Sequence, residues 1–593
     1  MRSKASGVAD STVDPPSQTG ASSSAGPSDL EWLPIRRQIS SALNYRPANM
    51  IPPSASSLLA LSAVVSTAWA ATDPVLEPKN FDVADALLDL GVDVTEIPAL
   101  AEDSKRSTAG CAAACKSLKF LYGDAAVETK GEVAYEAFTS SFWSANQGDV
   151  DPHCIFKPSK GKDVSVVVLL SRLTQCPFAA KSGGHAAMAG ASSVEGGITI
   201  SFMNMQGVSL SKDKKIASIE PGNTWGPVFE KLAKSDVTVI GGRLSNIGVG
   251  GLTTGGGISY FSNLYGWACD NVDSYEVVLA NGAIVKASAN KYKDLYWALR
   301  GGGNNFGLVV KFNLKTVPLP GGQMWGGNRL FTEDKFPELT KAVVGLVNNS
   351  PKDPKAGFWA VWGALNGTKI GLPTLYYSEP DGGDAEIWDE IDAITPVSDT
   401  TGNQEIGAWA KKNMEDAPIG LREMFYVIST KVDSGIVDFF KDLFFEKLPE
   451  VENIPGMFPS MVVQGITTPQ LKKMQNNGGN ALGLDAKDGP VLIVQLNAMW
   501  LNNSDDEVIY KWLSDIMRKT KDESKARGLD NDYVYMNYAS QFQDVVTTYG
   551  AENKAKLKSI SKKYDPQQVF QVLQPGYFKL EGAPVPNSGH FSH

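Results

Sequence analysis

One histidine ends a glycine turn in the middle of this chain of 593 residues. The segment reads Pro177-Phe-Ala-Ala-Lys-Ser-Gly-Gly-His185, which places an imidazole beside a flexible backbone and a basic Lys181. An imidazole can serve as a base, a metal ligand or a nucleophile. The chain has 4 histidines, which argues against a histidine-rich metal site and leaves little material for a Ser-His-Asp triad. We therefore expect no metal, and the surroundings of His185 must decide its role.

Glycine clusters in the same region favour a cofactor that carries phosphate groups. Glycine allows positive φ and close backbone approach, so that exposed amides can form a nest for a pyrophosphate. One cluster alone could be an ordinary turn or bulge. None fits G-x-G-x-x-G on a strand-to-helix turn, and GxxxxGK[ST] is absent, so the Rossmann and P-loop interpretations fail. The clusters are Ser182-Gly-Gly-His185, Gly248-Val-Gly-Gly251, Gly255-Gly-Gly257 and Gly301-Gly-Gly303 with Gly307.

Several spaced segments together resemble the berberine-bridge-enzyme-like family, which belongs to the vanillyl-alcohol-oxidase and p-cresol-methylhydroxylase (PCMH) superfamily. The resemblance covers about residues 110–577 and includes the histidine loop. The other matching segments are Glu220-Pro-Gly-Asn-Thr-Trp225, Gly248-Val-Gly-Gly-Leu-Thr-Thr-Gly-Gly-Gly257, Tyr265-Gly-Trp-Ala-Cys-Asp-Asn-Val272, Asp294-Leu-Tyr-Trp-Ala-Leu-Arg-Gly-Gly-Gly-Asn-Asn-Phe-Gly307, Tyr535-Met-Asn-Tyr538, Tyr549-Gly-x-x-Asn553 and Tyr564-Asp-Pro566.

The resemblance implies FAD, bound covalently from a ring nitrogen of His185 to the 8α-methyl carbon of the flavin. Some relatives attach the flavin twice, through a cysteine that corresponds to Gly248 here, so we expect a single link. Cys269 lies further along the chain and does not replace that cysteine. The implied cofactor-binding residues are Lys181, Ser182, Gly183, Gly184, His185, Gly248, Gly250, Gly251, Gly255, Gly256, Asp270, Asn271, Val272, Gly307, Val309 and Asn537.

A catalytic base is needed as well, because oxidation by a flavin combines hydride transfer from a substrate carbon with loss of a proton. Berberine-bridge relatives use a glutamate on a strand that ends in tryptophan. In Val494-Gln-Leu-Asn-Ala-Met-Trp500 that position is Asn497, which cannot act as a base.

The resemblance points instead to Tyr535 in the Tyr-x-Asn pattern as the base. A neighbouring positive group or tyrosine would have to lower its pKa, and Tyr377 or Tyr376 could assist. Asn537 is expected to contact the flavin ring or to position the substrate. The alternative is that Tyr535 and Tyr538 only pack or hydrogen-bond.

Short β-branched runs separated by turns predict a strand-rich α+β region between about residues 160 and 320. Its expected strands are 198–202, 275–282 and 306–314, with 164–170 either a strand or a helix capped by Asp163. Further strands are expected at 357–362 and 490–496, and helices near 384–393 and 505–518.

We expect an α+β fold in which a two-part FAD-binding domain of PCMH type accompanies a separate α+β substrate domain, and a C-terminal segment returns to the FAD domain. The expected parts are a disordered leader or gene-model extension at 1–49, a signal peptide at 50–70, the N-terminal part of the FAD domain at 71–145, the PCMH-type domain at 146–318, the substrate domain at 319–525 and the C-terminal segment at 526–593.

An apolar run from Met50 ends in Ala68-Trp-Ala70, a pattern typical of a secretory signal peptide. A signal anchor or a buried helix are the alternatives, and Met50 is the expected start of translation. Export agrees with the glycosylation sequons at Asn348, Asn366 and Asn502.

An oxidising compartment also bears on the 5 cysteines, of which one of Cys111 or Cys115 is expected to pair with Cys154. The sequence leaves open which of the two it is. The formal charge of −10 is spread along the chain without a basic run, so we expect no nucleic acid partner. We expect no membrane association of the mature form, because no window after the signal peptide is long and apolar enough to span a bilayer.

The expected protein is a secreted FAD-dependent oxidoreductase. It would take a hydride from a small alcohol, sugar or secondary metabolite and be reoxidised by O2. A dehydrogenase with another electron acceptor and a noncatalytic, flavin-stabilised binding protein are the alternatives. A glycoside hydrolase is disfavoured because no acidic pair stands out.

Overall fold

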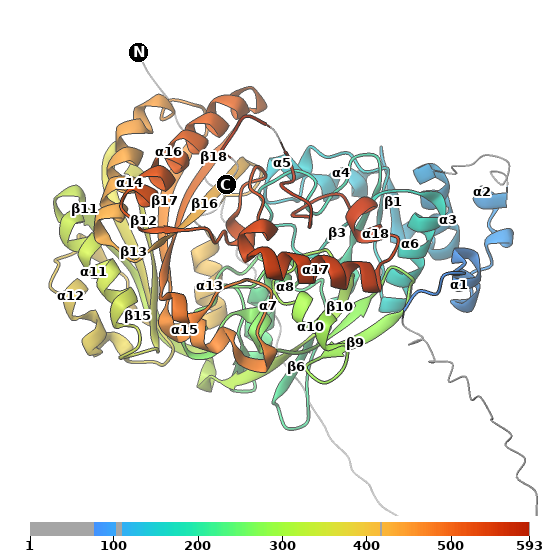
Figure 1. Cartoon of the computed structure of the whole chain (residues 1–593), viewed down its shortest axis with the longest axis horizontal. Coiled ribbons are helices and arrows are strands. Elements are labelled where there is room, and N and C mark those ends of the chain that lie inside the picture. Colours follow the sequence, from blue (N-terminus) through green and yellow to red (C-terminus); the bar gives the residue numbers. More distant parts are fainter. Residues whose placement is uncertain (1–75, 102–109, 416–417, 587, 592–593) are drawn as a thin grey trace, which may run out of the picture. The chain divides into compact units, whose positions relative to one another are not determined.

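The computed structural model describes residues 76–101, 110–415, 418–586 and 588–591, and its elements are drawn in Figure 1. The leader and signal peptide expected at 1–49 and 50–70 lie outside the described residues. The described part contains three β-sheets with helices packed against them, in agreement with the expected α+β class.

The first sheet has the order β1-β2-β4-β3, and β4 runs parallel to both of its neighbours. Parallel strands need a long crossover, and α6 (Gly161–Thr174) supplies it between β2 and β3. The strand interpretation of 164–170 is therefore wrong and the helical one holds, since α6 is buried on all sides. Asp163 lies in its first turn, whereas the N-cap is Lys160. The strands are β1 (Val127–Thr129), β2 (Cys154–Phe156), β3 (Phe178–Lys181) and β4 (Ile198–Ser201).

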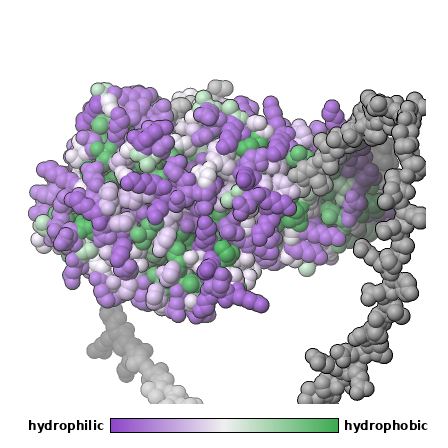
Figure 2. All heavy atoms as spheres, turned by 60° about the horizontal axis from the view of Figure 1, so that its bottom comes forward, coloured by the Kyte–Doolittle hydropathy of each residue, from purple (hydrophilic) through white to green (hydrophobic). Residues whose placement is uncertain are grey.

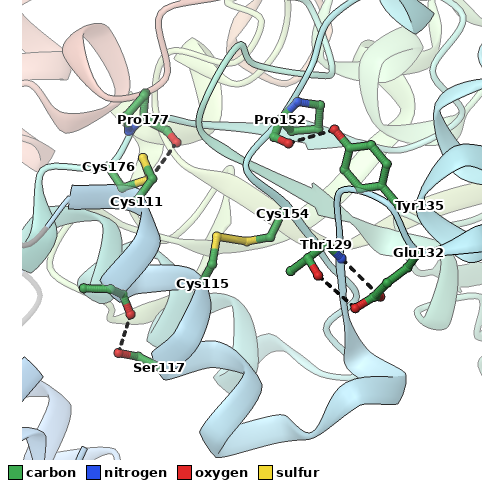
Figure 3. Close-up of a disulfide and its surroundings, with 11 residues drawn as sticks. Cys111, Cys115, Ser117, Thr129, Glu132, Tyr135, Pro152, Cys154, Cys176 and Pro177 are labelled. Atoms are coloured by element: carbon green, nitrogen blue, oxygen red, sulfur yellow. Dashed lines mark hydrogen bonds between the residues drawn. A yellow bond between two sulfur atoms is a disulfide. The ribbon is translucent and has the colours of Figure 1, made fainter. Parts of the chain in front are cut away.

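Two disulfides tie α3 (Gly110–Tyr122) to this sheet, and Figure 3 shows both leaving the same helix. Cys115 bonds to Cys154 at the start of β2, which confirms the expected pairing and decides between the two candidates. The second bond, from Cys111 to Cys176 just before β3, was not expected. It fastens the strand that leads directly into the His185 loop.

The second sheet has the order β5-β6-β10-β8-β9, with β7 also paired to β10. The long β10 lies between β6 and β8. The strands expected at 275–282 and 306–314 correspond to β8 and β10. The elements of this region are β5 (Val208–Leu210), β6 (Ile216–Ile219), α7 (Trp225–Ala233), β7 (Val237–Val239), α8 (Val249–Thr254), α9 (Ser262–Tyr265), β8 (Val272–Val278), β9 (Ile284–Ser288), α10 (Lys293–Ala298) and β10 (Leu308–Pro318).

The third sheet has nine strands in the order β14-β11-β13-β12-β17-β18-β16-β19, with β15 paired to β11. The strands are β11 (Gln323–Thr332), β12 (Ala356–Leu365), β13 (Thr368–Tyr377), β14 (Ser398–Asp399), β15 (Gly402–Glu405), β16 (Arg422–Lys431), β17 (Phe458–Ile466), β18 (Val491–Trp500) and β19 (Asp530–Asn531).

Helices cover one face of this sheet. Because successive side chains of a strand point to opposite faces, every second residue points away from these helices. On β16, Met424 and Tyr426 join the core under the helices, whereas Val427 packs with the core of the preceding sheet. In Figure 1 the helices lie along the outer side of β16–β18 and β11–β13. They are α11 (Phe336–Asn349), α14 (Ser434–Lys447) and α16 (Asp506–Ala526).

The C-terminal segment packs on earlier elements. Figure 1 shows α17 (Ala551–Tyr564) beside α10, where Tyr564 donates a hydrogen bond of 2.7 Å to Asp294. The backbone N–H of Phe178 on β3 donates to Leu573 O at 2.7 Å. This chain end therefore supports the strand that carries the His185 loop.

The surface offers little that would indicate a docking or metal site. On the face drawn in Figure 2, hydrophilic residues dominate and apolar ones form small separate groups. Among the described residues, no helix combines the length and apolar character needed to span a bilayer. The same part of the chain has no cluster of three or more His, Cys, Asp or Glu side chains that could hold a metal ion.

Candidate active site

The His185 loop follows β3 and presents a neutral imidazole. The ring of His185 stacks on Trp143, with 4.0 Å between centroids and 15° between planes. Burial lowers the pKa of His185 to about 4, so the ring is uncharged at neutral pH. Its Nε2 atom is buried and has no hydrogen-bond partner among the described residues. A neutral ring nitrogen without a partner is suited to bonding with a ligand.

The loop is held in place by α5 (Ala145–Gly148). Gln147 donates to the carbonyl of Ala186 at 2.6 Å, and Asn146 donates to the carbonyl of Ala187 at 3.1 Å. Lys181 lies over the rings of two phenylalanines, Phe138 and Phe142, and burial lowers its pKa. The Lys181 amine therefore packs behind the loop.

The first two glycine clusters meet backbone to backbone. A Cβ atom on Gly248 would lie 2.2 Å from the backbone nitrogen of Gly183, and one on Gly183 would lie 2.5 Å from that of Gly248. Ser182 joins the two loops, because its hydroxyl donates to Pro221 O at 2.6 Å and accepts from the N–H of Gly250 at 3.1 Å. Next to this crossing, a Cβ on Gly251 would meet no atom within 4 Å.

The third glycine cluster is packed against the Tyr-x-Asn motif. A Cβ on Gly255 would lie 2.0 Å from Oδ1 of Asn537. Asn537 donates to Leu252 O at 3.1 Å and to the hydroxyl of Tyr535 at 3.0 Å. A Cβ on Gly256 would strike Trp267 at 2.7 Å. Asn537 therefore packs directly on the third glycine cluster, and its contact with the flavin or the substrate stays a prediction.

The hydroxyl of Tyr535 is buried against the glycine turn. It accepts hydrogen bonds from the N–H groups of Gly257 at 3.1 Å and Ile258 at 3.2 Å, in addition to that from Asn537. Burial raises the pKa of Tyr535, and the neighbouring Tyr538 adds to the rise. The hydroxyl of Tyr535 therefore binds the backbone of the glycine turn, and its role as the base stays a prediction.

The structure does not bring Tyr377, the predicted assistant, to the face of the sheet that packs with Tyr535. Tyr376 and Tyr377 are adjacent on β13, so their side chains point to opposite faces of the sheet. Tyr377 packs on the helix-covered side and donates to Asp353 at 2.9 Å. Tyr376 is the one that points toward the FAD-binding part, where it contacts Tyr260 with ring centroids 5.3 Å apart.

Other predicted cofactor residues are engaged within the chain. Asp270 accepts from the N–H of Trp267 at 2.9 Å, and burial raises its pKa to about 6. Asn271 donates to Trp267 O at 2.9 Å and Val272 begins β8. Positions Gly307 and Val309 lie at β10 against β8. These side chains shape the walls, and direct contact with a cofactor stays a prediction for them.

Sequence reasoning missed a cluster around Arg243, which lies between β7 and α8. Its Nη2 donates to Gln464 Oε1 at 2.7 Å and to the hydroxyl of Tyr538 at 2.9 Å. The guanidinium lies over the ring of Trp359 at 4.5 Å. An arginine inside a glycine-rich segment was the available signal. Asn497 occupies the position at which berberine-bridge relatives have the glutamate base. Its Oδ1 accepts a hydrogen bond from Nε2 of Gln495 at 2.5 Å.

Buried polar atoms without partners gather around these loops, as expected for a site that a polar ligand completes. The walls described above suit the isoalloxazine and pyrophosphate of FAD, because they combine a neutral imidazole, glycines without room for side chains and free polar groups. Among the described residues the unpartnered atoms include Trp143 Nε1, Asn146 Oδ1, His185 Nε2, Arg243 Nη1 and Asn246 Oδ1.

Comparison with known proteins places the chain in a family. A model described as FAD binding domain matches residues 152–288, and one described as berberine and berberine like matches residues 534–575. The FAD-dependent monooxygenase tpcD of Cochliobolus heterostrophus is 35% identical over 459 residues, which cover 74% of this chain and 87% of the relative. The chain belongs to the berberine-bridge-enzyme-like family of FAD-linked oxidoreductases. A second relative of this oxidoreductase is the FAD-dependent monooxygenase drtC of Aspergillus calidoustus, which is 31% identical with 83% and 95% of the two chains covered.

Solved structures confirm the fold of the oxidoreductase. The 6-hydroxy-D-nicotine oxidase of Arthrobacter nicotinovorans matches with a TM-score of 0.65 and 18% identity, over 77% of this chain and 97% of the other. Berberine bridge enzyme from Eschscholzia californica matches with a TM-score of 0.64 and 18% identity, over 79% and 99%. The expected family, α+β fold and FAD-linked oxidoreductase class are therefore confirmed.

Another missed residue of the oxidoreductase is Glu423, which lies on β16 beside the His185 loop. Its side chain is 1% exposed, and neither carboxyl oxygen has a hydrogen-bond partner among the described residues. It lines a small pocket together with Ala187, Met188 and Tyr510. Burial raises its pKa from 4.5 to about 9, so the folded enzyme holds a proton there that the unfolded chain releases.

The substitution Glu423→Gln should therefore stabilise the enzyme at alkaline pH. A group with a raised pKa in the folded state contributes stability that is lost as pH rises from 4.5 through about 9. Removing the carboxyl should raise the free energy of unfolding by up to about 4 kcal/mol at pH 8 and by little near pH 4.5. Urea unfolding at both pH values measures this, with the exposed Glu452→Gln as control. A variant no more stable than the wild type at pH 8 would contradict it.

Proposed function

We propose that this oxidoreductase oxidises a small organic substrate with FAD linked covalently to His185. The observation that carries the proposal is the buried, neutral imidazole stacked on Trp143, with Nε2 unpartnered among the described residues. When bound, FAD accepts a hydride from a substrate carbon. The residues around it bind and orient the substrate and receive its proton.

We propose a single covalent link. Four of the 5 cysteines form disulfides, and the remaining Cys269 is buried beside Asp270. The crossing of Gly183 and Gly248 leaves no room for a side chain at position 248. Both observations support His185 as the sole attachment point.

His185→Ala should release the flavin when the protein is denatured. The wild-type chain should keep its yellow colour and flavin fluorescence through denaturing gel electrophoresis, because the covalent bond survives unfolding. The substitution His153→Ala alters an exposed histidine and serves as control. Flavin that leaves the denatured wild-type chain would refute covalent attachment.

We propose Tyr538 as the proton acceptor in place of Tyr535. Its hydroxyl receives a hydrogen bond from Arg243 at 2.9 Å, so a positively charged donor faces that oxygen. Tyr538 follows Asn537 and contacts Tyr535 with ring centroids 4.8 Å apart, so it lies beside the glycine turn. The phenolate form of Tyr538 would take the proton of a substrate hydroxyl or amine and become the neutral hydroxyl, while the substrate carbon would give its hydride to the flavin.

Tyr538→Phe should slow anaerobic flavin reduction by a factor of about 100 to 10,000, the usual contribution of a positioned base. Stopped-flow loss of flavin absorbance with a substrate from an alcohol, sugar and phenol panel measures this rate. Tyr377→Phe is the control, because Tyr377 faces the opposite side of the sheet. Equal rates in wild type and Tyr538→Phe would exclude the role.

O2 is the proposed electron acceptor, which would take two electrons and two protons to give hydrogen peroxide. The relatives named FAD-dependent monooxygenases favour a second candidate, in which one oxygen atom enters the product. Reaction under ¹⁸O2 separates the two candidates. An oxidase should release labelled hydrogen peroxide and leave the product unlabelled, whereas a monooxygenase should place ¹⁸O in the product. Reduction of an added dye without oxygen consumption would favour a dehydrogenase.

We also propose that the protein is secreted, with residues 50–70 as its signal peptide. Disulfides persist in oxidising compartments, and both disulfides of the described residues support export. The sequon asparagines Asn348, Asn366 and Asn502 are all exposed. Protein collected from a eukaryotic culture medium should lose mass on treatment with an N-glycosidase and begin after residue 70. An unglycosylated protein that begins at Met1 would contradict export.

A further inference from the structure

Arg243 is a buried cation whose charge no acidic side chain of the described residues pairs. One of its two hydrogen bonds goes to the neutral amide oxygen of Gln464, and the other goes to Tyr538, whose hydroxyl is also neutral except in the phenolate form that the proposed proton transfer requires. Burial works to lower the pKa of Arg243, and the nearby tyrosines Tyr538, Tyr376 and Tyr260 more than offset it. A buried charge is costly unless it is paired, so this site calls for an anion.

The guanidinium has one nitrogen available for that anion. Both hydrogen bonds use Nη2, whereas Nη1 is buried and has no hydrogen-bond partner in the described part of the chain. Tyr376 also lies against the guanidinium: burial raises the pKa of the Tyr376 hydroxyl, and the charge and hydrogen bonding of Arg243 work against that larger effect. Because Gln464 and Tyr538 fix Nη2, the direction in which Nη1 donates is also fixed.

The surroundings of Arg243 are aromatic. Trp359 lies under the guanidinium, and Tyr376 packs against Trp359 with ring centroids 5.9 Å apart. Tyr260 stacks on Trp409 at 4.7 Å. Flat aromatic molecules pack well against such walls. Tyr538 accepts a hydrogen bond from Arg243, and the residue before it, Asn537, packs on the glycine turn. The aromatic cluster around Arg243 therefore adjoins the proposed flavin site.

We propose that Arg243 anchors an anionic oxygen of a flat aromatic substrate, a carboxylate or an ionised phenol, through Nη1. The inference rests on the proposed function, and it names the substrate class of that same site. The anion would satisfy the buried guanidinium, while its aromatic ring would pack against the cluster formed by Trp359, Tyr376 and Tyr260, whose rings contact one another. Arg243 thereby selects acidic aromatic compounds over neutral ones of the same shape.

Benzoate and benzamide test this selection, because they have nearly the same shape and differ in charge. The holoenzyme is titrated with each probe, and binding is followed by the change in the flavin absorption spectrum. Wild type should bind benzoate about tenfold or more tightly than benzamide, and Arg243→Met should lose about tenfold or more for benzoate alone. Arg243→Lys should restore part of the affinity for benzoate.

A second variant keeps the arginine and changes its partner. Gln464→Glu places a carboxylate on Nη2, which should neutralise the guanidinium and weaken benzoate binding without affecting benzamide. This variant covers the case in which Arg243→Met fails to fold. Equal losses for both probes, or no benzoate binding by flavin-loaded wild type, would overturn the inference.

Two further readouts separate a substrate anchor from a residue that acts on the cofactor. If Arg243→Met shifts the flavin reduction potential but leaves benzoate affinity unchanged, the guanidinium acts on the cofactor and the inference is overturned.

Flavin content is measured first by absorbance. A wild-type protein that binds no flavin would refute the proposed function itself, whereas a flavin-loaded, substrate-reducible enzyme without probe discrimination would refute the inference alone.

Discussion

The close backbone crossing of the Gly183 and Gly248 loops is the constraint on which the site depends. Neither position has room for a Cβ atom, and the Ser182 hydroxyl joins the two loops by accepting a hydrogen bond from the N–H of Gly250. The first loop ends in His185, and the second leads into the glycine turn against Asn537. A single contact between two backbones therefore sets where a flavin would be attached and where its ring would lie.

The third sheet adds the substrate wall through the period of two along its strands. One face is buried under helices, so its side chains belong to a closed apolar core. The opposite face carries Phe425, Gln464 and Tyr376 toward the flavin-binding part, and Phe425 reaches Trp143 with ring centroids 5.7 Å apart. This explains why Tyr377, one residue from Tyr376, takes no part in the site.

Local sequence predicted the parts of the site that lie on short segments. The histidine loop and the glycine clusters could be identified from residue types and family resemblance, whereas their packing on Asn537 is known only from the fold. The Arg243 cluster could not be predicted in this way, because its hydrogen bonds join residues 221 and 295 positions apart. The α6 segment was ambiguous because a fully buried helix has no polar face to reveal its period.

These long-range contacts also carry the proposal that Tyr538, and not Tyr535, is the base. Tyr535 and Tyr538 belong to one short motif, and nothing within it distinguishes a hydroxyl that holds a turn from one that faces a cation. The fold makes the distinction: backbone N–H groups surround the first hydroxyl, and the Arg243 guanidinium meets the second. Since Arg243 also keeps Nη1 for a further partner, one buried charge can orient the proton acceptor and the substrate together. That coupling ties substrate choice to proton transfer at a single residue.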